Sequence, residues 1–463
     1  MKETAYRIEK DSMGEVRVPS DRLYGAQTKR ALENFTISDL RIPSSFLKAL
    51  ALVKECCAKA NCKVGVLDEN LTNSIVEAAK EIATGNYDKE FPIDVFQTGS
   101  GTSWNMNINE VIANIANARL GAPLGSKSPI HPNDHVNRSQ SSNDVIPTAM
   151  NIAARLDANN LVAALKDLAQ TLKTKELEFS SIYKLGRTHL QDAVPMKVGQ
   201  EFSAWKSQIE HSIKRISNCF DSLEELALGG TAIGSGLNCP TGFKEVAVNY
   251  ISKETGVEFC CASNPFEAIS ARDSMQELMG ALNTVAVSIF KIANDVRLLS
   301  SGPRCGFGEL ILPSLQPGSS IMPGKVNPVM CEMMIQVAAT VMGLHTSVTI
   351  GCQTAPLQLN IMMPLIAYNV LFALSILTNA VNNFNLKAMR DISVDKQVCQ
   401  EKIEYSLSIV TPLALRVGYD KAAQIAHYAY ENKMKIYDAV LALSDLSKEE
   451  VAQILSISNM VKQ

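Results

Sequence analysis

Long apolar stripes with a helical repeat run through the middle of the chain. From 198 to 226, apolar side chains recur every three or four residues, at Val198, Phe202, Trp205, Ile209, Ile213, Ile216, Phe220, Leu223 and Leu226. These steps predict one helix of 29 residues, about 43 Å long at about 1.5 Å per residue. Similar patterns cover residues 148–177, 272–300, 329–350 and 361–390. Helices of this length favour a bundle of long helices.

Shorter helical patterns flank these stripes. Apolar positions at helical spacing occupy residues 44–84 and 105–120, and beyond residue 395 the patterns shorten while charges become more frequent. A chain of 463 residues is too long for a single hydrophobic core. We therefore predict an all-α fold of three domains, namely a mixed, mainly helical N-terminal domain (1–138), a central long-helix bundle (139–394) and a small helical C-terminal domain (395–463).

The composition is that of an ordinary soluble globular protein, with 46% apolar and 20% charged residues. The net charge of -3 and the lack of any basic run argue against a nucleic-acid partner. The most apolar run, 361–377, is interrupted by Pro364, Asn369 and Ser375. It is also shorter than the ~18 residues that suggest a membrane span, so we expect no membrane partner.

The cysteines and the N-terminus indicate a reducing compartment. Eleven cysteines, an odd number, form no Cys-x-x-Cys pair, and no histidine is spaced to complete a zinc site. We expect free thiols and no metal. The first eleven residues carry acids and no apolar core, which predicts neither a secretory signal nor a transit peptide. These features together predict a cytoplasmic protein.

The segment 318–328, Gly-Ser-Ser-Ile-Met-Pro-Gly-Lys-Val-Asn-Pro, is the first candidate site. Its glycines, prolines and serines predict a loop between two helices, with backbone N–H groups available to an anion. Lys325 adds a positive charge and Asn327 an amide donor, while Ser319 or Ser320 supplies a hydroxyl that can act as base or nucleophile. The alternative is a simple connector between helices.

Three further polar segments interrupt the helical patterns, at 98–103, 141–144 and 186–189. They consist mostly of Ser, Thr, Asn and Gly, which are also the residues that cap helix starts. Taken together, uncharged donors and helix N-termini form a pocket suited to a small dicarboxylate. A glycine-rich stretch at 229–242 follows no predicted strand and does not fit Gly-x-Gly-x-x-Gly, so we expect no dinucleotide cofactor.

His189 and Glu332 each have two interpretations. His189 is either an acid/base near neutrality or a histidine hydrogen-bonded inside a helix bundle. Glu332 follows the 318–328 loop and is either a first-turn acid favoured by the helix dipole or a partner that polarises His189. The residue pattern leaves both choices open.

The 318–328 segment resembles, residue for residue, the mobile catalytic loop of the fumarase/aspartase superfamily. The similarity covers nearly the whole chain, including Asp11-Ser12-Met13-Gly14 and Gly418-Tyr419-Asp420. It implies a homotetramer whose active sites combine motifs from three subunits. It also implies a small dicarboxylate substrate. We expect no metal or organic cofactor, because the sequence has no ligand cluster and no nucleotide-binding loop.

For a class II fumarase, the branch that the motifs favour, the resemblance implies reversible hydration of fumarate to L-malate, a step of the tricarboxylic acid cycle. Ser319 would be the base, and His189 backed by Glu332 would handle the leaving water. The implied substrate contacts are Ser100, Gly101, Thr102, Ser141, Ser142, Asn143, Thr188, Ser320, Lys325, Val326 and Asn327. A secondary dicarboxylate site is implied at His131, Pro132, Asn133 and Asp134.

Two alternatives within the superfamily stay open. Thr188-His189 and Ser141-Ser142-Asn143 resemble fumarases, whereas Pro356-Leu357-Gln358-Leu359-Asn360 is closer to aspartate ammonia-lyases. A non-catalytic structural homologue is the third possibility, and the intact Ser319 and Lys325 argue against it. Trp104 stands where fumarases usually have a small residue, so the pocket volume or the packing of the turn would differ.

Overall fold

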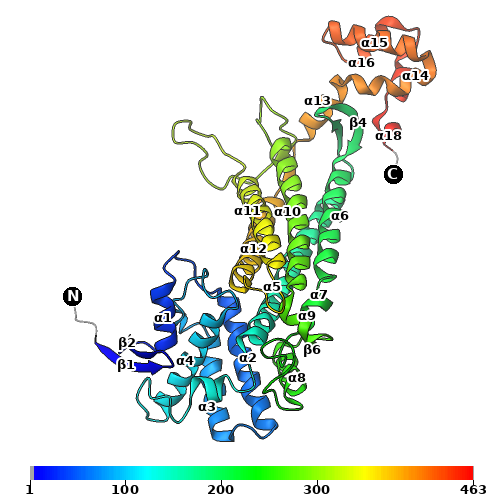
Figure 1. Cartoon of the computed structure of the whole chain (residues 1–463). Helices are drawn as coiled ribbons and strands as arrows, with labels where there is room; N and C mark the ends of the chain where they lie inside the picture. Colours follow the sequence, from blue (N-terminus) through cyan, green and yellow to red (C-terminus); the bar gives the residue numbers. More distant parts are fainter. Residues whose placement is uncertain (1–4, 462–463) are drawn as a thin grey trace. The chain divides into compact units, whose positions relative to one another are not determined.

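The computed structural model describes residues 5–461, so residues 1–4, part of the segment expected to lack a targeting signal, lie outside it. The chain is mostly helical, as predicted, and its few strands are short (Figure 1). It divides into two compact units. Unit 1 comprises residues 1–162, 214–286 and 338–378, and unit 2 comprises 163–213, 287–337 and 379–463. The predicted three-domain boundaries stay a prediction.

Some elements lie entirely within unit 1. They are β1 (Tyr6–Asp11), β2 (Gly14–Pro19), α1 (Ala26–Asn34), α2 (Ser44–Lys63), α3 (Glu69–Ala83), α4 (Thr102–Arg119), α7 (Phe220–Glu224), β5 (Glu225–Leu226), α8 (Phe243–Thr255), β6 (Cys260–Cys261) and α9 (Pro265–Ser270). Helix α4 is buried on nearly all sides, because Trp104 to Asn117 are all buried. The two-residue strand β5 precedes the glycine-rich stretch, contrary to our expectation.

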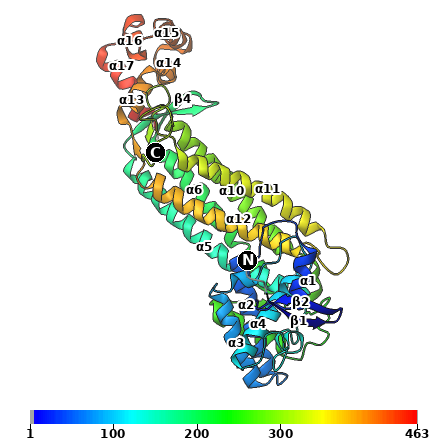
Figure 2. The same ribbon diagram turned by 90° about the vertical axis from the view of Figure 1, so that its left-hand side faces the viewer.

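Five long helices contribute residues to both units. They are α5 (Ser142–Glu178), α6 (Val198–Ser217), α10 (Asp273–Leu299), α11 (Val329–Gln353) and α12 (Met363–Phe384), followed by one wider turn, Asn385–Met389. Within unit 1, Ser274 on α10 donates to Asn151 on α5, and Asn369 on α12 donates to Ser347 on α11. Both views show α10, α11 and α12 running alongside one another, so the predicted bundle of long helices is confirmed (Figures 1 and 2).

The single helix predicted for 198–226 is wrong. Helix α6 ends at Ser217, a turn at Asn218 and Cys219 separates it from the five-residue α7, and Glu225 and Leu226 form strand β5. The N–H of Cys219 bonds to Ile216 O at 3.1 Å, a tighter closure that ends the helical hydrogen-bond pattern. The apolar spacing survives the break, because Leu223 and Leu226 are still buried. Periodicity therefore detected the buried face but not the interruption.

Unit 2 contains a second group of short elements. They are β3 (Tyr183–Thr188), β4 (Gln191–Lys197), β7 (Leu310–Ile311), β8 (Ser393–Val394), α13 (Lys396–Tyr405), α14 (Thr411–Val417), α15 (Tyr419–Glu431), α16 (Ile436–Leu443), α17 (Lys448–Ile454) and α18 (Ile457–Met460). The C-terminal helices enclose an apolar cluster that includes Ile403, Leu413, Ile425, Ile436 and Val440. Leu185 of β3 belongs to the same cluster, so these helices support the β3–β4 hairpin.

Candidate active site

The polar turn at 98–103 leads into helix α4. The hydroxyls of Ser100 and Thr102 are hydrogen-bonded at 2.9 Å, which fixes both side chains at the first turn of the helix. Gly101 has φ +72°, and a Cβ there would lie 3.0 Å from the side chain of Ile146 on α5. Glycine at 101 thus lets the start of α4 lie against α5.

The segment 141–144 caps helix α5. The Ser141 hydroxyl accepts the N–H of Asn143 at 3.3 Å, and the Asp144 carboxylate accepts the N–H of Ser141 at 2.8 Å. Both bonds satisfy N–H groups at the start of the helix, so the capping interpretation is confirmed for this segment. The amide of Asn143 donates to Ala232 O at 2.8 Å and ties the helix start to the glycine-rich loop.

Two of the predicted polar segments are thereby brought together within unit 1. Asn105, in the first turns of α4, donates to the hydroxyl oxygen of Ser142 at 3.0 Å. The N-termini of an 18-residue helix and a 37-residue helix therefore lie beside each other. Helix N-termini carry partial positive charge and outward N–H groups, so this arrangement favours a bound anion.

Asp144 was not among the predicted site residues. Its buried carboxylate accepts the N–H groups of Gly229 and Thr231, both at 3.0 Å, in addition to that of Ser141. Burial raises the pKa of Asp144 to about 6, against the lowering effect of these three hydrogen bonds. The Ser-x-x-Asp spacing at 141–144 is a capping signal in the sequence, but the contact with the glycine-rich loop is visible only in the fold.

Asp144 predicts a specific pH dependence of stability. Its folded pKa of about 6 exceeds the ordinary 3.8, so between these values the folded protein binds more protons than the unfolded chain. The free energy of unfolding contributed by Asp144 should therefore fall by about 2 kcal/mol from pH 4 to pH 7. In urea unfolding, the stability of the wild type relative to an Asp144→Asn variant should decline over this range. A difference that is flat with pH would contradict the assignment.

The predicted secondary site is a single helical turn, Pro132–Val136, preceded by His131. His131 Nδ1 accepts the N–H groups of Asn133 and Asp134, both at 3.2 Å. Burial lowers the pKa of His131, which suits this accepting role. Pro132 is buried, whereas Asn133 and Asp134 are exposed. The two N–H groups of this turn are thus already satisfied by the imidazole, and any ligand must meet the exposed side chains.

Thr188 and His189 lie at the tip of the β3–β4 hairpin in unit 2 rather than inside a helix bundle. His189 and Leu190 have φ of +55° and +61°, which is the backbone of a two-residue hairpin turn. Both Thr188 and His189 are exposed. The interpretation of His189 as a histidine hydrogen-bonded inside a bundle is therefore wrong, and its side chain is open to a ligand or a partner.

Glu309 forms ion pairs with strand β3 of this hairpin. It was not among the residues predicted from the sequence. It is 1% exposed, and its carboxylate lies 2.5 Å from the Arg187 guanidinium and 3.2 Å from the Lys184 ammonium. A buried carboxylate needs such partners, because an unpaired buried charge is strongly unfavourable. The ion pairs connect β3 to the segment just before β7.

The loop 318–328 is closed by its own backbone in unit 2. Gly318 N–H donates to Lys325 O at 2.7 Å, and the Asn327 amide donates to Gly318 O at 2.8 Å. A Cβ on Gly318 would meet Asn327 N at 2.8 Å, so only glycine fits this close approach. The Ser319 hydroxyl oxygen accepts the N–H groups of Ile321 at 3.2 Å and Met322 at 3.1 Å. The loop is thus a compact, mostly exposed structure.

The flanking predicted residues take up positions at the edges of this loop. Ser320, Lys325 and Val326 are exposed, and Asn327 is half-buried. Glu332 lies in the first turn of α11, as predicted, and its N–H donates to Pro328 O at 3.2 Å. Figure 1 draws the loops before α11 and the β3–β4 hairpin as separate projections. Within one chain, the 318–328 loop and the hairpin that carries His189 are therefore separate structures.

Trp104 does not face the site. Its side chain is 0% exposed and packs on Phe46 of α2 with ring centroids 5.3 Å apart. The indole fills the interior of unit 1 behind the turn at 98–103. We predicted that Trp104 changes either the pocket volume or the packing of the turn, and its position shows that it affects the packing.

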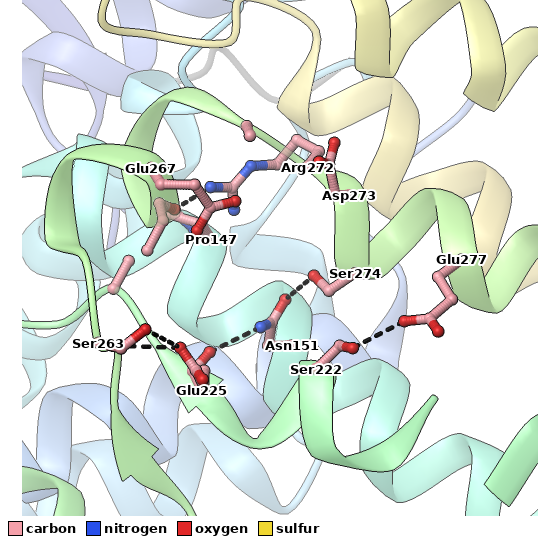
Figure 3. Close-up of a pocket in the computed structure, with 13 residues that line it drawn as sticks. Pro147, Asn151, Ser222, Glu225, Ser263, Glu267, Arg272, Asp273, Ser274 and Glu277 are labelled. Atoms are coloured by element: carbon pink, nitrogen blue, oxygen red, sulfur yellow. Dashed lines mark hydrogen bonds between the residues drawn. The ribbon is translucent and has the colours of Figure 1, made fainter. Parts of the chain in front are cut away.

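Unit 1 also contains a cavity of about 440 Å³ that is unsuited to a dicarboxylate (Figure 3). Arg272 is the cation there, and its N–H donates to Ala268 O, while burial lowers its pKa to about 10. The acidic lining residues are Glu225, Glu267, Asp273 and Glu277. Four carboxylates near one guanidinium repel a dianion, so this cavity does not suit a dicarboxylate ligand.

The described residues hold no group of three or more His, Cys, Asp or Glu placed to bind a metal ion. All eleven cysteines, which lie between residues 56 and 399, are free.

Known proteins match this chain over nearly its full length. Residues 14–343 match the family model described as a lyase, and residues 409–462 match the model described as the fumarase C C-terminus. The model of the lyase family alone spans more than two thirds of the 463 residues.

Individual relatives define the branch. The chain is 46% identical to fumarate hydratase class II 2 of Bradyrhizobium diazoefficiens, covering 99% of this chain and 97% of that protein. It is also 46% identical to the mitochondrial fumarate hydratase of Homo sapiens, covering 99% and 90%. The crystal structure of class II fumarase from Schistosoma mansoni superposes with a TM-score of 0.94 at 39% identity, covering 98% and 99%. The chain therefore belongs to the fumarase/aspartase superfamily of lyases, in its class II fumarase branch.

Proposed function

We propose that the protein is a fumarate hydratase that adds water reversibly to fumarate and forms L-malate. The observation that carries the proposal is the pairing of the α4 and α5 N-termini through Asn105 and Ser142, amid uncharged donors. Such a site favours a small dianion without requiring a cofactor. Membership of the class II fumarase branch supports this reaction over the deamination of aspartate.

In the direction of malate dehydration, Ser319 takes the proton from the carbon beside a carboxylate. The electron pair of that C–H bond moves into the carboxylate, which becomes an aci-carboxylate. Lys325 and Asn327 hold this added charge more tightly than the ground state, as catalysis requires. The C–O bond then breaks on the opposite face, and His189, backed by Glu332, gives a proton to the departing water.

The remaining predicted residues bind the substrate in this proposal. Hydroxyl, amide and backbone donors hold the two carboxylates, and they come from Ser100, Gly101, Thr102, Ser141, Ser142, Asn143, Thr188, Ser320 and Val326. The turn of His131, Pro132, Asn133 and Asp134 is proposed as a secondary dicarboxylate site. Its exposed Asn133 amide is the group we expect to meet the ligand.

We further propose that the protein acts as a homotetramer, with each active site shared between subunits. Helix α11 and the segment Met363–Met389, which comprises α12 and the wider turn after it, are both long and apolar enough to span a membrane. The buried share of their most apolar windows is 22% and 61%. Helix α11 also carries His345 and Thr349, which hydrogen bond to Gln276 on α10. These polar contacts do not suit lipid, so we expect copies of this chain, not a membrane, to cover α11.

The proposed location is the cytoplasm. The free thiols suit a reducing compartment. Mitochondrial relatives also exist, so the class of enzyme alone does not decide the location.

The test follows the ultraviolet absorption of the fumarate double bond. Addition of L-malate to the purified protein should raise the absorption, because dehydration creates the conjugated double bond. Addition of L-aspartate should leave the absorption unchanged. A rise with aspartate alone would identify an ammonia-lyase, and no rise with either compound would favour a non-catalytic homologue.

A further inference from the structure

A buried lysine lies behind the helix starts in unit 1. Lys54 on α2 is 0% exposed, and its Nζ donates to Asn137 Oδ1 at 3.1 Å and to Gln140 Oε1 at 2.8 Å. Asn137 and Gln140 belong to the turn that leads directly into Ser141. The ammonium group therefore holds two side chains of the turn immediately before α5.

The Asn137 side-chain oxygen is the centre of this network. Besides Lys54, it accepts from Asn105 Nδ2 and Asn109 Nδ2 of α4, each at 3.1 Å. An ammonium group has donors only, so it selects the oxygen of the Asn137 amide over its nitrogen. That oxygen in turn selects the NH₂ end of the Asn105 amide.

Asn105 in turn orients the hydroxyl group of Ser142 through a hydrogen bond. Its NH₂ group has two hydrogens, one directed to Asn137 Oδ1 and the other to Ser142 Oγ at 3.0 Å. Because the Ser142 oxygen is already an acceptor, its own hydroxyl hydrogen is left to point away from Asn105. A hydroxyl held in this way is ready to donate to a carboxylate.

We propose that Lys54 is a positioning residue that, through Asn137 and Asn105, orients the Ser142 hydroxyl as a hydrogen-bond donor to a substrate carboxylate. This inference rests on the proposed function, because it takes Ser142 as a substrate contact. Lys54 itself is fully buried and does not touch the substrate.

Two opposing effects act on the pKa of Lys54. Burial lowers its pKa to about 7, against the raising effect of the Asp144 carboxylate on α5. Since a buried ammonium group is costly, its retention beside the substrate contacts is more consistent with a role in binding than with stability alone.

A double-mutant cycle tests the proposal. Lys54→Met removes the charge and keeps the length, and Ser142→Ala removes the hydroxyl. Each single variant should lower kcat/KM for L-malate by about tenfold or more, because each loses a hydrogen bond to a charged group. If Lys54 acts through Ser142, Lys54→Met should have little further effect when Ser142→Ala is already present. Equal losses in both backgrounds would overturn the proposal.

Two additional variants keep the test decisive. Asn105→Ala removes the hydrogen bond to Ser142 but leaves the contacts of Lys54 with Asn137 and Gln140. This variant replaces Lys54→Met if Lys54→Met does not fold. Its effect on kcat/KM should likewise be small when Ser142→Ala is already present. Lys59→Met is the matched control, because Lys59 lies on the same helix but pairs with Glu55 and Glu254. It should leave kcat/KM within about twofold of the wild type. If the wild-type protein itself fails to convert malate, the proposed function is at fault rather than the role of Lys54.

Discussion

A Ser319→Ala variant should lose roughly a hundred- to ten-thousandfold of kcat, the range expected when an acid/base group is removed. The Ser319 oxygen accepts two backbone N–H groups, from Ile321 and Met322. Hydrogen bonds of this kind stabilise the alkoxide more than the neutral hydroxyl, which favours its use as a base. Alanine leaves these two N–H groups to water in an exposed part of the loop, so the fold should be retained.

The matched control is Ser320→Ala, because the two serines are adjacent and Ser320 is exposed. We expect Ser320→Ala to lose far less of kcat than Ser319→Ala. The assay is the absorption change with L-malate, and circular dichroism with size-exclusion chromatography confirms the fold and the assembly. Retained turnover in Ser319→Ala, or a larger loss in Ser320→Ala, would show that the base is misassigned.

A mixture of two inactive variants should regain activity. We expect Ser319→Ala and His189→Asn to be inactive or nearly so when each is expressed alone. If the loop and the hairpin of one active site come from different subunits, some sites in mixed tetramers receive an intact Ser319 and an intact His189. With random assembly, about one quarter of the sites should be intact. Co-expression should therefore restore up to about a quarter of wild-type activity.

The control pairs two variants of the same loop. Ser319→Ala mixed with Lys325→Met cannot produce an intact loop, because each chain carries one of the two defects. That mixture should stay inactive in the same malate assay. Restoration in this control, or none in the mixture with His189→Asn, would contradict a site shared between the hairpin of one subunit and the loop of another.

Helical periodicity predicted the long elements well but not their interruptions. The stripes at 272–300 and 329–350 correspond to α10 and α11, whereas the stripe at 198–226 breaks at Asn218. The spacing of apolar residues indicates which face of a segment is buried. A short interruption of the helix that keeps the same face buried does not change this spacing. The β3–β4 hairpin was missed because Arg187-Thr188-His189 lacks the Asn-Gly or Asp-Gly signal of a tight hairpin.

Two buried charged residues, one in each unit, could not be identified from the sequence. Lys54 and Glu309 look like ordinary solvated charges, and only burial at 0% and 1% exposure reveals that they are fixed inside the protein. Lys54 hydrogen bonds to Asn137, which is more than eighty residues away along the chain. Glu309 pairs with Arg187, which is even further away in the sequence. Such contacts form only after distant segments have packed together.

The sequence by itself determined the helical class, the polar segments and the resemblance that their motifs carry, because these are properties of neighbouring residues. Only the tertiary structure decided that α4 and α5 present their N-termini together, that His189 is exposed on a hairpin, and that Trp104 lies in the interior. The physical reason is that helix propensity, capping and turn chemistry act over a few residues. Burial and the pairing of buried charges depend on the whole packed chain.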